Sequence, residues 1–405
     1  MKRLVTQAFP GVLRKWTGPG RADMMVRMSA PRLLIISFSP LRSDARILKQ
    51  IALFKDRYEI TTCGYGDAPD GVASHIEIPA NLKEWDYDRI AVILRAYRRA
   101  YWTNPVIAHL RPRFAGRSFD VVLANDIDTA GLALSLQSVH GVHLDLHEYH
   151  PRTKEELLRW RIFVGPFMRW LVRHFATQAD SVSTVAGHIA DEYRREFGLH
   201  ASVVTNAAPF SDFEPGAVGN PIRLVHSGAA QHGRFIELTL DAMGMLAGNA
   251  TLDLYLTQNK GPYYESLRRR VDSMPNVALH APVPYAELSR TLNDYDVGVY
   301  VLPPINFNFA WSLPNKFFDF VQARLGLVIG PSPEMAAIVR AEGIGVVTEN
   351  FTAEALAAAL DALTPEGVAD YKRASALAAR KLSAEEQVKE WARAIDALVG
   401  SRKAT

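Results

Sequence analysis

The chain has 405 residues, of which 48% are hydrophobic and 22% are charged, and its net charge is +3. This length accommodates two domains with full hydrophobic cores, and the composition is ordinary for a globular protein. No apolar run reaches the ~18–20 residues that a membrane-spanning helix requires. The single cysteine, Cys63, excludes an internal disulfide and favours a reducing, cytoplasmic compartment.

Charge is unevenly distributed along the chain. Residues 1–200 hold 28 Lys or Arg against 21 Asp or Glu, a net charge of +7, whereas the remainder carries −4. The basic first half would attract an acidic partner. Residues 1–30 are basic but lack the apolar core of a signal peptide, so we expect an N-terminal arm there, with Met24, Met25 or Met28 as an alternative start.

Residues 31–210 alternate between strand and helix patterns. We expect strands at 31–38, 58–62, 119–126, 142–146 and 180–185, and helices at 45–54, 88–102, 129–136, 157–175 and 186–197. Residues 201–209 close the domain. The helix at 45–54 would turn Ile47, Leu48, Ile51 and Leu53 inward. Alternating strands and helices predict an α/β domain with a parallel sheet.

A second α/β set follows a linker at 211–221 that is rich in Gly, Pro, Ser and Asp. We expect strands at 222–228, 251–257, 277–280, 296–302 and 325–329, and helices from 235, 262, 283, 313, 353 and 384. The sequence therefore predicts two doubly wound Rossmann-like domains that face each other across a cleft, the second over residues 222–380.

The stretch 312–323 carries the strongest functional signal. Ser312 suits a helix cap and Pro314 a first helical turn, so a helix is expected to begin near Leu313, directly after a buried strand. Its N-terminus would offer free N–H groups and a partial positive charge at the C-terminal edge of a parallel sheet, where ligands bind.

Two side chains on this helix extend the signal. Lys316 adds a full positive charge for phosphate, and Asp319, three residues on, lies on the same face and could accept two sugar hydroxyls. This pair fits a nucleotide-sugar site. A solvent-facing Lys/Asp pair on an ordinary amphipathic helix is the alternative.

The strand at 222–228 leads into a loop of similar character. Gly228 would let the backbone approach a ligand, and Arg234 sits at the start of the next helix, where a diphosphate could bind. The sequence therefore predicts a phosphate-binding turn at this point.

Acidic and imidazole side chains end two strands of the first domain. Asp126 follows one strand, and His147 and Glu148 follow the next, so they meet at the C-terminal edge and face the cleft. A strand-end His is often only hydrogen-bonded into structure, but two adjacent carboxylates favour a functional role. His143, Asp145 and His147 also alternate along one face and could bind a metal. We favour local hydrogen bonding for this set and expect no metal site.

Arginines are interleaved with aromatic residues at 88–102 and 157–175. Such segments can contact nucleic acid or the headgroup layer of a membrane, whereas a solvated helix face is the alternative. We expect no nucleic-acid partner and consider peripheral contact with an anionic membrane at its inner face.

Three motifs together resemble a known family. Ser-Leu-Pro-Asn-Lys-Phe-Phe-Asp-Phe at 312–320, with Leu-Val-Ile-Gly-Pro-Ser-Pro-Glu-Met at 327–335, resembles the donor-site block of retaining glycosyltransferases with the GT-B fold. That large family, glycosyltransferase family 4, includes sucrose synthase-like and polysaccharide-assembly enzymes. Asn-Asp-x-Asp-Thr at 125–129 and Asp-x-His-Glu-Tyr at 145–149 are similar to its other motifs.

The resemblance implies transfer of a sugar, with retention, from a nucleotide-diphosphate sugar to a saccharide, glycolipid or other acceptor, without a divalent metal or cofactor. It also implies that a last helix in 381–405 crosses back to the first domain. His147 would approach the donor sugar, with Asp126 and Glu148 nearby. The donor-binding residues it implies are Gly228, Arg234, Ser312, Asn315, Lys316, Asp319 and Glu334.

The chain departs from the family pattern at several positions. Trp311 stands where the first Glu of the Glu-x7-Glu motif would be, Ala229 replaces a basic residue, and Arg324 and Gly326 replace Gly and Pro. Two alternatives therefore stay open, a non-catalytic nucleotide-sugar-binding subunit and a nucleotide-sugar epimerase on the same fold. A phosphorylase with pyridoxal phosphate would need a Schiff-base lysine and a much longer chain.

Overall fold

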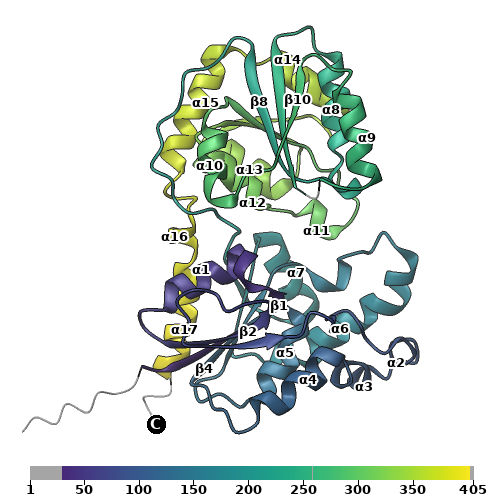
Figure 1. Ribbon diagram of the computed structural model, residues 1–405, viewed down its shortest axis with the longest axis vertical. Coiled ribbons are helices and arrows are strands. Elements are labelled where there is room, and N and C mark those ends of the chain that lie inside the picture. The colour runs from purple at the N-terminus through teal and green to yellow at the C-terminus, as the bar shows by residue number, and fades with distance from the viewer. Residues whose placement is uncertain (1–29, 258, 402–405) are drawn as a thin grey trace, which may run out of the picture. The chain divides into compact units, whose positions relative to one another are not determined.

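The computed structural model describes residues 30–257 and 259–401. Residues 1–29, which hold nearly all of the predicted basic arm, lie outside this range. The described part contains two parallel sheets flanked by helices, as shown in Figure 1. The predicted fold class, two doubly wound Rossmann-like halves, is confirmed.

The first sheet has seven parallel strands in the order β3-β2-β1-β4-β5-β6-β7. Its strands are β1 (Arg32–Pro40), β2 (Glu59–Tyr65), β3 (Ser74–Ile78), β4 (Val121–Asn125), β5 (Val142–Leu146), β6 (Ser181–Thr184) and β7 (Ala201–Val203). The strand order reverses between β1 and β4, which pair from Leu33 opposite Val121 to Ile36 opposite Ala124. Ligands of doubly wound sheets bind at this switch point, beyond the carboxyl ends of the strands.

The helices of the first half depart from prediction at several places, and the helix at Pro105–Phe114 was not predicted. They are α1 (Ala45–Phe54), α2 (Arg89–Ile93), α3 (Tyr97–Trp102), α4 (Pro105–Phe114), α5 (Ile127–Ser135), a wide π-type turn η3 (Trp160–Val164), α6 (Gly165–His174) and α7 (Gly187–Phe197). The single helix expected at 88–102 is wrong, because Arg95 adopts a φ of 58° and separates α2 from α3. The helix expected from 157 becomes regular only at Gly165. Leu48, expected inward on α1, is 39% exposed.

The second sheet has six parallel strands in the order β10-β9-β8-β11-β12-β13. They are β8 (Ile222–Ala229), β9 (Ala250–Thr257), β10 (Val277–His280), β11 (Val297–Tyr300), β12 (Gly326–Ile329) and β13 (Gly345–Val347). Here the order reverses between β8 and β11, so the loops after these two strands occupy the equivalent switch point.

Ten α-helices follow β8 in the described part of the chain. They are α8 (Ile236–Met245), α9 (Pro262–Val271), α10 (Tyr285–Asn293), α11 (Phe307–Ala310), α12 (Asn315–Gln322), α13 (Pro333–Glu342), α14 (Ala353–Asp361), α15 (Pro365–Ala378), α16 (Ala384–Gln387) and α17 (Lys389–Ser401). The predicted linker, residues 211–221, falls between β7 and β8. No helix among the described residues has the length and hydrophobicity that crossing a bilayer demands.

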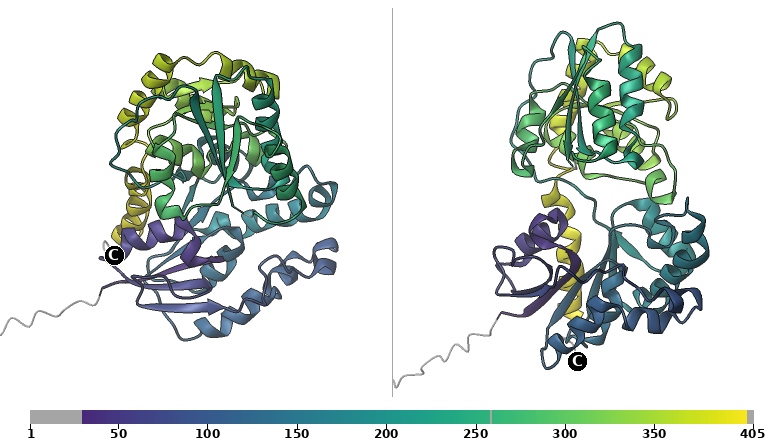
Figure 2. Two further views of the ribbon diagram at one scale, coloured as in Figure 1. Left: turned by 45° about the horizontal axis from the view of Figure 1, so that its top comes forward. Right: turned by 45° about the vertical axis from the view of Figure 1, so that its right-hand side comes forward.

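The strands are buried on both faces, as parallel sheets require. Leu33, Leu34, Ile35 and Ile36 of β1 are all fully buried, so β1 is apolar without alternation. The C-terminal helix α17 completes the first core: Trp391 is fully buried and shares a hydrophobic cluster with Leu33. Helix α17 contacts β4 and β6, and both views of Figure 2 show it beside the first sheet.

Arg324 stands where the resembling family has a glycine, and its contacts allow an arginine at this position. It ends α12 with a φ of 61°, a conformation that glycine adopts most readily. Its guanidinium is buried and donates to the carbonyls of Gln322 at 2.8 Å, Phe213 at 3.0 Å and Ser211. These charge-assisted hydrogen bonds offset the backbone strain and attach the linker to the end of α12.

Candidate functional site

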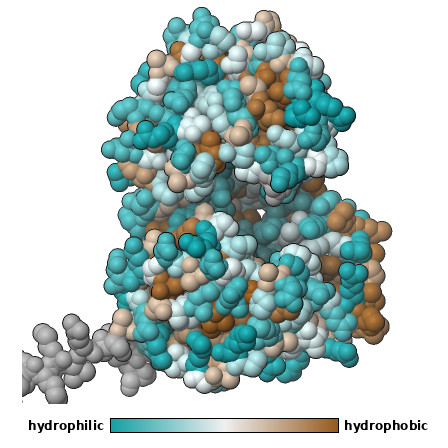
Figure 3. Space-filling view, viewed as in Figure 1, coloured by the Kyte–Doolittle hydropathy of each residue, from teal (hydrophilic) through white to brown (hydrophobic). Residues whose placement is uncertain are grey.

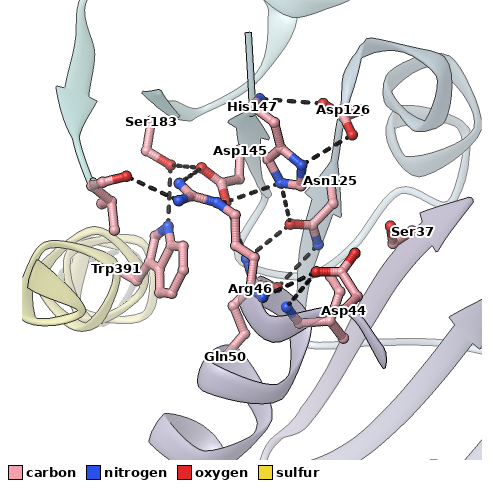
Figure 4. A network of polar contacts seen from close by, with 12 residues as sticks. Ser37, Asp44, Arg46, Gln50, Asn125, Asp126, Asp145, His147, Ser183 and Trp391 are labelled. Atoms are coloured by element: carbon pink, nitrogen blue, oxygen red, sulfur yellow. Dashed lines mark hydrogen bonds and ion pairs between the residues drawn. The ribbon is translucent and has the colours of Figure 1, made fainter. Parts of the chain in front are cut away.

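A buried ion pair forms the centre of a polar network in the first half (Figure 4). Arg46 in α1 donates from Nε and Nη2 to the two carboxylate oxygens of Asp145 in β5, at 2.6 and 2.7 Å. Its Nη1 donates to the carbonyl of Val204 at 2.9 Å, and its guanidinium lies over the Trp391 ring. The charged groups of Arg46 and Asp145 are both hydrogen-bonded within the protein. We therefore assign this ion pair a structural role and not a catalytic one.

His147 follows β5 and lies between two carboxylates. Its Nδ1 is 3.1 Å from Asp126, and its Nε2 is 3.6 Å from Asp145 and 3.3 Å from the amide oxygen of Asn125. Burial lowers the pKa of His147, but Asp126 and then Asp145 outweigh burial and raise the pKa to about 10. At neutral pH both ring nitrogens carry protons that point at protein oxygens. His147 is therefore a fixed positive charge and not a general base.

Asp126 lies between β4 and α5 with a φ of 66°, a strained conformation for a non-glycine residue. Its carboxylate accepts hydrogen bonds from Nδ1 of His147 at 3.1 Å, from the His147 backbone N–H at 3.2 Å and from Nε2 of His150 at 3.1 Å. Burial raises the pKa of Asp126, but the two histidines together hold it far below its usual range. The carboxylate is thus ionised and fixed in orientation.

Glu148, the third predicted catalytic residue, has a different environment. Its Oε2 accepts a hydrogen bond of 3.2 Å from Nδ2 of Asn308 in α11. Burial raises the pKa of Glu148, and His150 opposes that effect only in part. Of the three predicted catalytic residues, Glu148 is the one whose pKa moves toward neutrality, as a proton-transferring group requires.

His143 has a local structural role. It is fully buried, and its two ring nitrogens lie 2.8 Å from the hydroxyl of Ser181 and 2.9 Å from that of Ser183. Burial lowers the pKa of His143 to about 4, so the ring is neutral. Across residues 30–257 and 259–401, no three His, Cys, Asp or Glu side chains are grouped so that they could hold a metal ion.

In the second half, Lys316 occupies the first turn of α12 and reaches toward β8. Its Nζ is 3.3 Å from Nε2 of His226 and 4.4 Å from the ring centroid of Tyr300. Nδ1 of His226 donates to the carbonyl of Val299 at 3.0 Å. Burial and the neighbouring Lys316 hold the pKa of His226 well below its usual range, so the imidazole is neutral and its Nε2 accepts from the ammonium.

Gly228 makes room for this ammonium. It adopts a φ of 149°, and a Cβ built there would lie 2.5 Å from Nζ of Lys316. Any side chain at position 228 would therefore displace Lys316. The sequence predicted that Gly228 permits close approach of a ligand, and the structure adds a close approach by the lysine.

Two cations meet at this end of β8 without a neutralising anion. Burial lowers the pKa of Lys316 and Arg234 lowers it further, to about 7, against the opposing effect of Asp319. The described residues place no carboxylate within ion-pair distance of Lys316 or Arg234; the Arg234 guanidinium instead lies over the Phe309 ring. Two adjacent cations at a helix N-terminus form an anion-binding arrangement.

Asp319 lies one turn further along α12 and is only 4% exposed. Its Oδ1 is buried, and no described residue donates a hydrogen bond to it. Burial raises the pKa of Asp319 to about 7, although Lys49 and Lys316 act to lower it. Lys49 comes from α1, where its Nζ donates to the carbonyl of Ala207 at 2.8 Å. A buried acceptor without a donor is free to bind ligand hydroxyls.

The predicted cap of α12 is wrong. The helix begins at Asn315, its N-cap is Pro314, and no side chain caps it. Ser312 instead continues the turn after α11, because its backbone N–H donates to the carbonyl of Phe309. Its hydroxyl is buried and has no partner among the described residues, whereas Asn315 is exposed at the start of the helix.

Glu334, in the first turn of α13, contacts the first half of the molecule. Its Oε1 accepts hydrogen bonds from the backbone N–H of His188 at 2.6 Å and from Nδ1 of the same residue at 2.9 Å. His188 belongs to α7. The structure thus uses Glu334, a predicted donor ligand, in a contact between the two halves.

Sequence reasoning missed three residues of the site, His226, Lys49 and Asn308. His226 lies two positions before Gly228 on a strand, so strand alternation places both on one face and could have indicated it. Lys49 and Asn308 contact residues 158 and 160 positions away. No local pattern marks residues whose partners are that distant.

Solved structures resemble this chain over nearly its whole length. Sucrose-phosphate synthase from Thermosynechococcus elongatus matches with a TM-score of 0.68 and 11% identity over 92% of this chain and 100% of its own. The E. coli trehalose-6-phosphate structure bound with UDP-2-fluoro glucose matches with a TM-score of 0.63 and 12% identity over 91% and 99%. HepE from Anabaena in complex with UDP matches with a TM-score of 0.63 and 12% identity. The match covers 91% of this chain and 100% of HepE.

The chain has the GT-B fold. No protein-family profile matches the sequence, and neither does any curated protein. Within the GT-B fold, Lys316, Arg234 and Asp319 gather at the switch point of the second sheet, and Asp126, His147 and Glu148 at the carboxyl ends of β4 and β5 in the first.

Proposed function

We propose that the protein transfers a sugar from a nucleotide-diphosphate sugar to a saccharide, glycolipid or other acceptor. The observation that carries this proposal is the pair of cations, Lys316 and Arg234, which meet without an anion beside Gly228. A diphosphate is the anion that fits two cations and a helix N-terminus. Solved structures of the same fold hold UDP and UDP-2-fluoro glucose, which supports a nucleotide ligand.

In this proposal the second half binds the donor and stabilises its leaving group. As the bond between sugar and diphosphate breaks, negative charge develops on the diphosphate. The bound diphosphate keeps Lys316 protonated, and Lys316 with Arg234 stabilises that charge. These cations supply the charge that a divalent metal would otherwise provide, so we propose metal-independent transfer. Asp319 would accept hydroxyls of the ribose through its unpaired oxygen.

The first half would hold the reacting sugar and the acceptor. His147 and Asp126 contribute fixed charges, because each is locked by hydrogen bonds to the other. Glu148, with its raised pKa, is our candidate for handling the acceptor proton. We assign no covalent nucleophile, since the Asp126 carboxylate already accepts three hydrogen bonds. Retention and membership of glycosyltransferase family 4 are further parts of the proposal, drawn from the motifs at 125–129, 145–149 and 312–335.

The test is a donor-turnover assay in the presence of a chelator. The purified protein is incubated with UDP-, GDP- and TDP-linked sugars and a mixture of simple saccharide acceptors. We expect release of one nucleoside diphosphate, and an NMR spectrum in which the product keeps the anomeric configuration of the donor. Inversion of that configuration would contradict retention, and activity that requires an added metal ion would contradict metal independence.

A non-catalytic nucleotide-sugar-binding subunit is the second candidate, because Trp311 replaces an acidic residue of the donor block. The same assay separates the candidates. A subunit would bind a nucleotide without turning over any donor, and an epimerase would release nucleotide and altered sugar without an acceptor. Either result would replace the transferase proposal.

A further inference from the structure

An exposed apolar surface covers α2 and the segment that leads into α6. Six aliphatic side chains there are at least half exposed: Ile90 (70%), Ile93 (54%), Leu94 (72%), Leu157 (52%), Leu158 (62%) and Ile162 (50%). Helix α2 contacts the turn η3, so the two groups adjoin. Figure 3 shows hydrophobic atoms gathered at the right-hand edge of the lower half, where Figure 1 places α2. We call these six residues the α2–η3 surface.

Arginines without partners surround the α2–η3 surface. Five lie on or next to it and, within residues 30–257 and 259–401, form no side-chain hydrogen bond or ion pair: Arg89, Arg95, Arg98, Arg159 and Arg161. All five are exposed. On α7, by contrast, two exposed arginines are paired, Arg194 with Asp191 and Arg195 with Glu192. The positive charge of the α2–η3 surface is therefore available to an external partner.

The two chain segments that carry the α2–η3 surface have a net positive charge. Residues 83–102 and 154–173 together hold ten Lys or Arg against five Asp or Glu, a net charge of +5 in a chain of +3, so the rest of the chain is net negative. Trp85, 69% exposed, adds an amphipathic ring of the kind found at membrane interfaces.

We propose that the α2–η3 surface docks the protein on the headgroup layer of an anionic lipid bilayer. The aliphatic side chains would enter the acyl boundary while the arginines contact the lipid phosphates. Exposed Ile and Leu side chains are suited to contact with lipid hydrocarbon. A surface that binds single-stranded nucleic acid instead offers aromatic rings for base stacking and a positively charged groove. This proposal goes beyond sugar transfer and does not depend on it, because none of these residues belongs to the candidate site.

The α2–η3 surface would place an acceptor anchored in the bilayer next to the first half of the protein. The segment 154–164 that carries Leu157, Leu158 and Ile162 also contacts α11: the backbone N–H of Phe307 donates to Glu155 at 2.7 Å. Asn308, the next residue of α11, donates to Glu148. The docking surface and the candidate site are thus connected by short stretches of chain.

Vesicle co-sedimentation tests the proposal. The full chain is mixed with phosphatidylcholine vesicles that contain either no anionic lipid or about 30% phosphatidylglycerol. We expect binding to the anionic vesicles that weakens as salt is added, because exposed charges are screened. Replacing Ile90, Leu94 and Leu158 together by Ser should lower the vesicle partition coefficient more than about tenfold. Arg98→Gln with Arg161→Gln should lower it about tenfold.

Two matched variants control for general surface effects. Leu377→Ser removes an aliphatic side chain that is 87% exposed on α15, and Arg269→Gln removes an exposed arginine on α9. Both should bind vesicles as the unmodified protein does. Equal binding to neutral and anionic vesicles, or unchanged binding by the triple Ser variant, would overturn the proposal. A dimer that the triple Ser variant dissociates, without vesicle binding, would assign this surface to a second copy of the chain and would also overturn it.

Nucleotide binding separates this proposal from the proposed function. The triple Ser variant should keep the nucleoside diphosphate affinity of the unmodified protein, measured by calorimetry, while losing vesicle binding. Vesicle binding without nucleotide affinity would sustain the docking proposal and reject the transferase. Loss of both vesicle binding and nucleotide affinity in the triple Ser variant would indicate misfolding. In that case the double variant Arg98→Gln with Arg161→Gln decides the docking proposal.

Discussion

The indole of Trp311 stacks on the imidazole of His188, with ring centroids 3.9 Å apart and planes inclined by 14°. Trp311 follows α11 in the second half, and His188 belongs to α7 in the first. The same imidazole donates to Glu334. At the position where the resembling family has an acidic residue, this chain therefore has an aromatic contact between its two halves.

A double-mutant cycle should detect this contact. Trp311→Ala and His188→Ala each remove one ring, and we expect their effects on the free energy of unfolding to be non-additive by about 1 kcal/mol. Denaturant titration of the four proteins measures the coupling. Additive effects would show that the rings lie together without an energetic consequence.

Gly228→Ala should displace Lys316, because the new Cβ would come within 2.5 Å of the ammonium. We expect nucleoside diphosphate affinity to fall by about tenfold or more, since the loss of one charge-assisted contact costs about 1.5–3 kcal/mol. The matched control is Gly244→Ala in α8, where a Cβ meets nothing within 4 Å. Gly244→Ala should leave affinity unchanged and stabilise the helix by about 0.5–1 kcal/mol. Equal affinities for both variants would refute the packing argument.

His147 should make stability depend on pH in the alkaline range. Its pKa is raised from 6.5 to about 10 in the folded protein, so the stabilisation is fully present below pH 6.5 and is lost as pH rises toward 10. The loss attributable to this group should be about 5 kcal/mol, at about 1.4 kcal/mol per pKa unit. Denaturant titrations across this range should show a decline for the unmodified protein and a flatter profile for His147→Gln. A parallel decline in both proteins would assign the pH dependence to other groups.

Nucleotide binding should consume protons above neutral pH. The pKa of Lys316 is about 7 without ligand, and a bound diphosphate would raise it by stabilising the ammonium. The contribution of Lys316 to affinity should then be constant below pH 7 and fall by up to about tenfold per pH unit above it. At about pH 8 Asp319 is already largely ionised, so calorimetry in two buffers of different ionisation enthalpy reports proton uptake by Lys316. Lys316→Met should show no uptake, and uptake that persists in this variant would contradict the assignment.

The sequence predicted most of the strands and the first helix, because their signals are local, but it did not predict β3 and β13. The run Leu33 to Ile36 is apolar without alternation, as a strand buried on both faces must be, and α1 spans the predicted residues 45–54. The break at Arg95 was not predictable in this way. Arginine rarely adopts a left-handed φ, so nothing in the local pattern indicated a break at this residue.

In the candidate site, too, some features follow from local sequence signals and others do not. Asp126, His147 and Glu148 follow adjacent parallel strands. The alternation of strand and helix patterns in the sequence was therefore enough to predict that these three residues lie close together. The partner of Asp145 is instead Arg46, 99 residues away, and that of Glu148 is Asn308. Such contacts depend on how the two sheets and their loops pack, which no local spacing encodes.

Calorimetric titration without added metal, against uridine, guanosine and thymidine diphosphates, tests the diphosphate site itself. The unmodified protein, Lys316→Met and the control Lys389→Met, an exposed lysine on α17, are compared. We expect binding of one nucleotide at about micromolar Kd, retained in Lys389→Met and weakened at least about tenfold in Lys316→Met. Absence of binding to all three nucleotides, or equal affinity in both variants, would contradict the assignment of Lys316 and Arg234 as a diphosphate site.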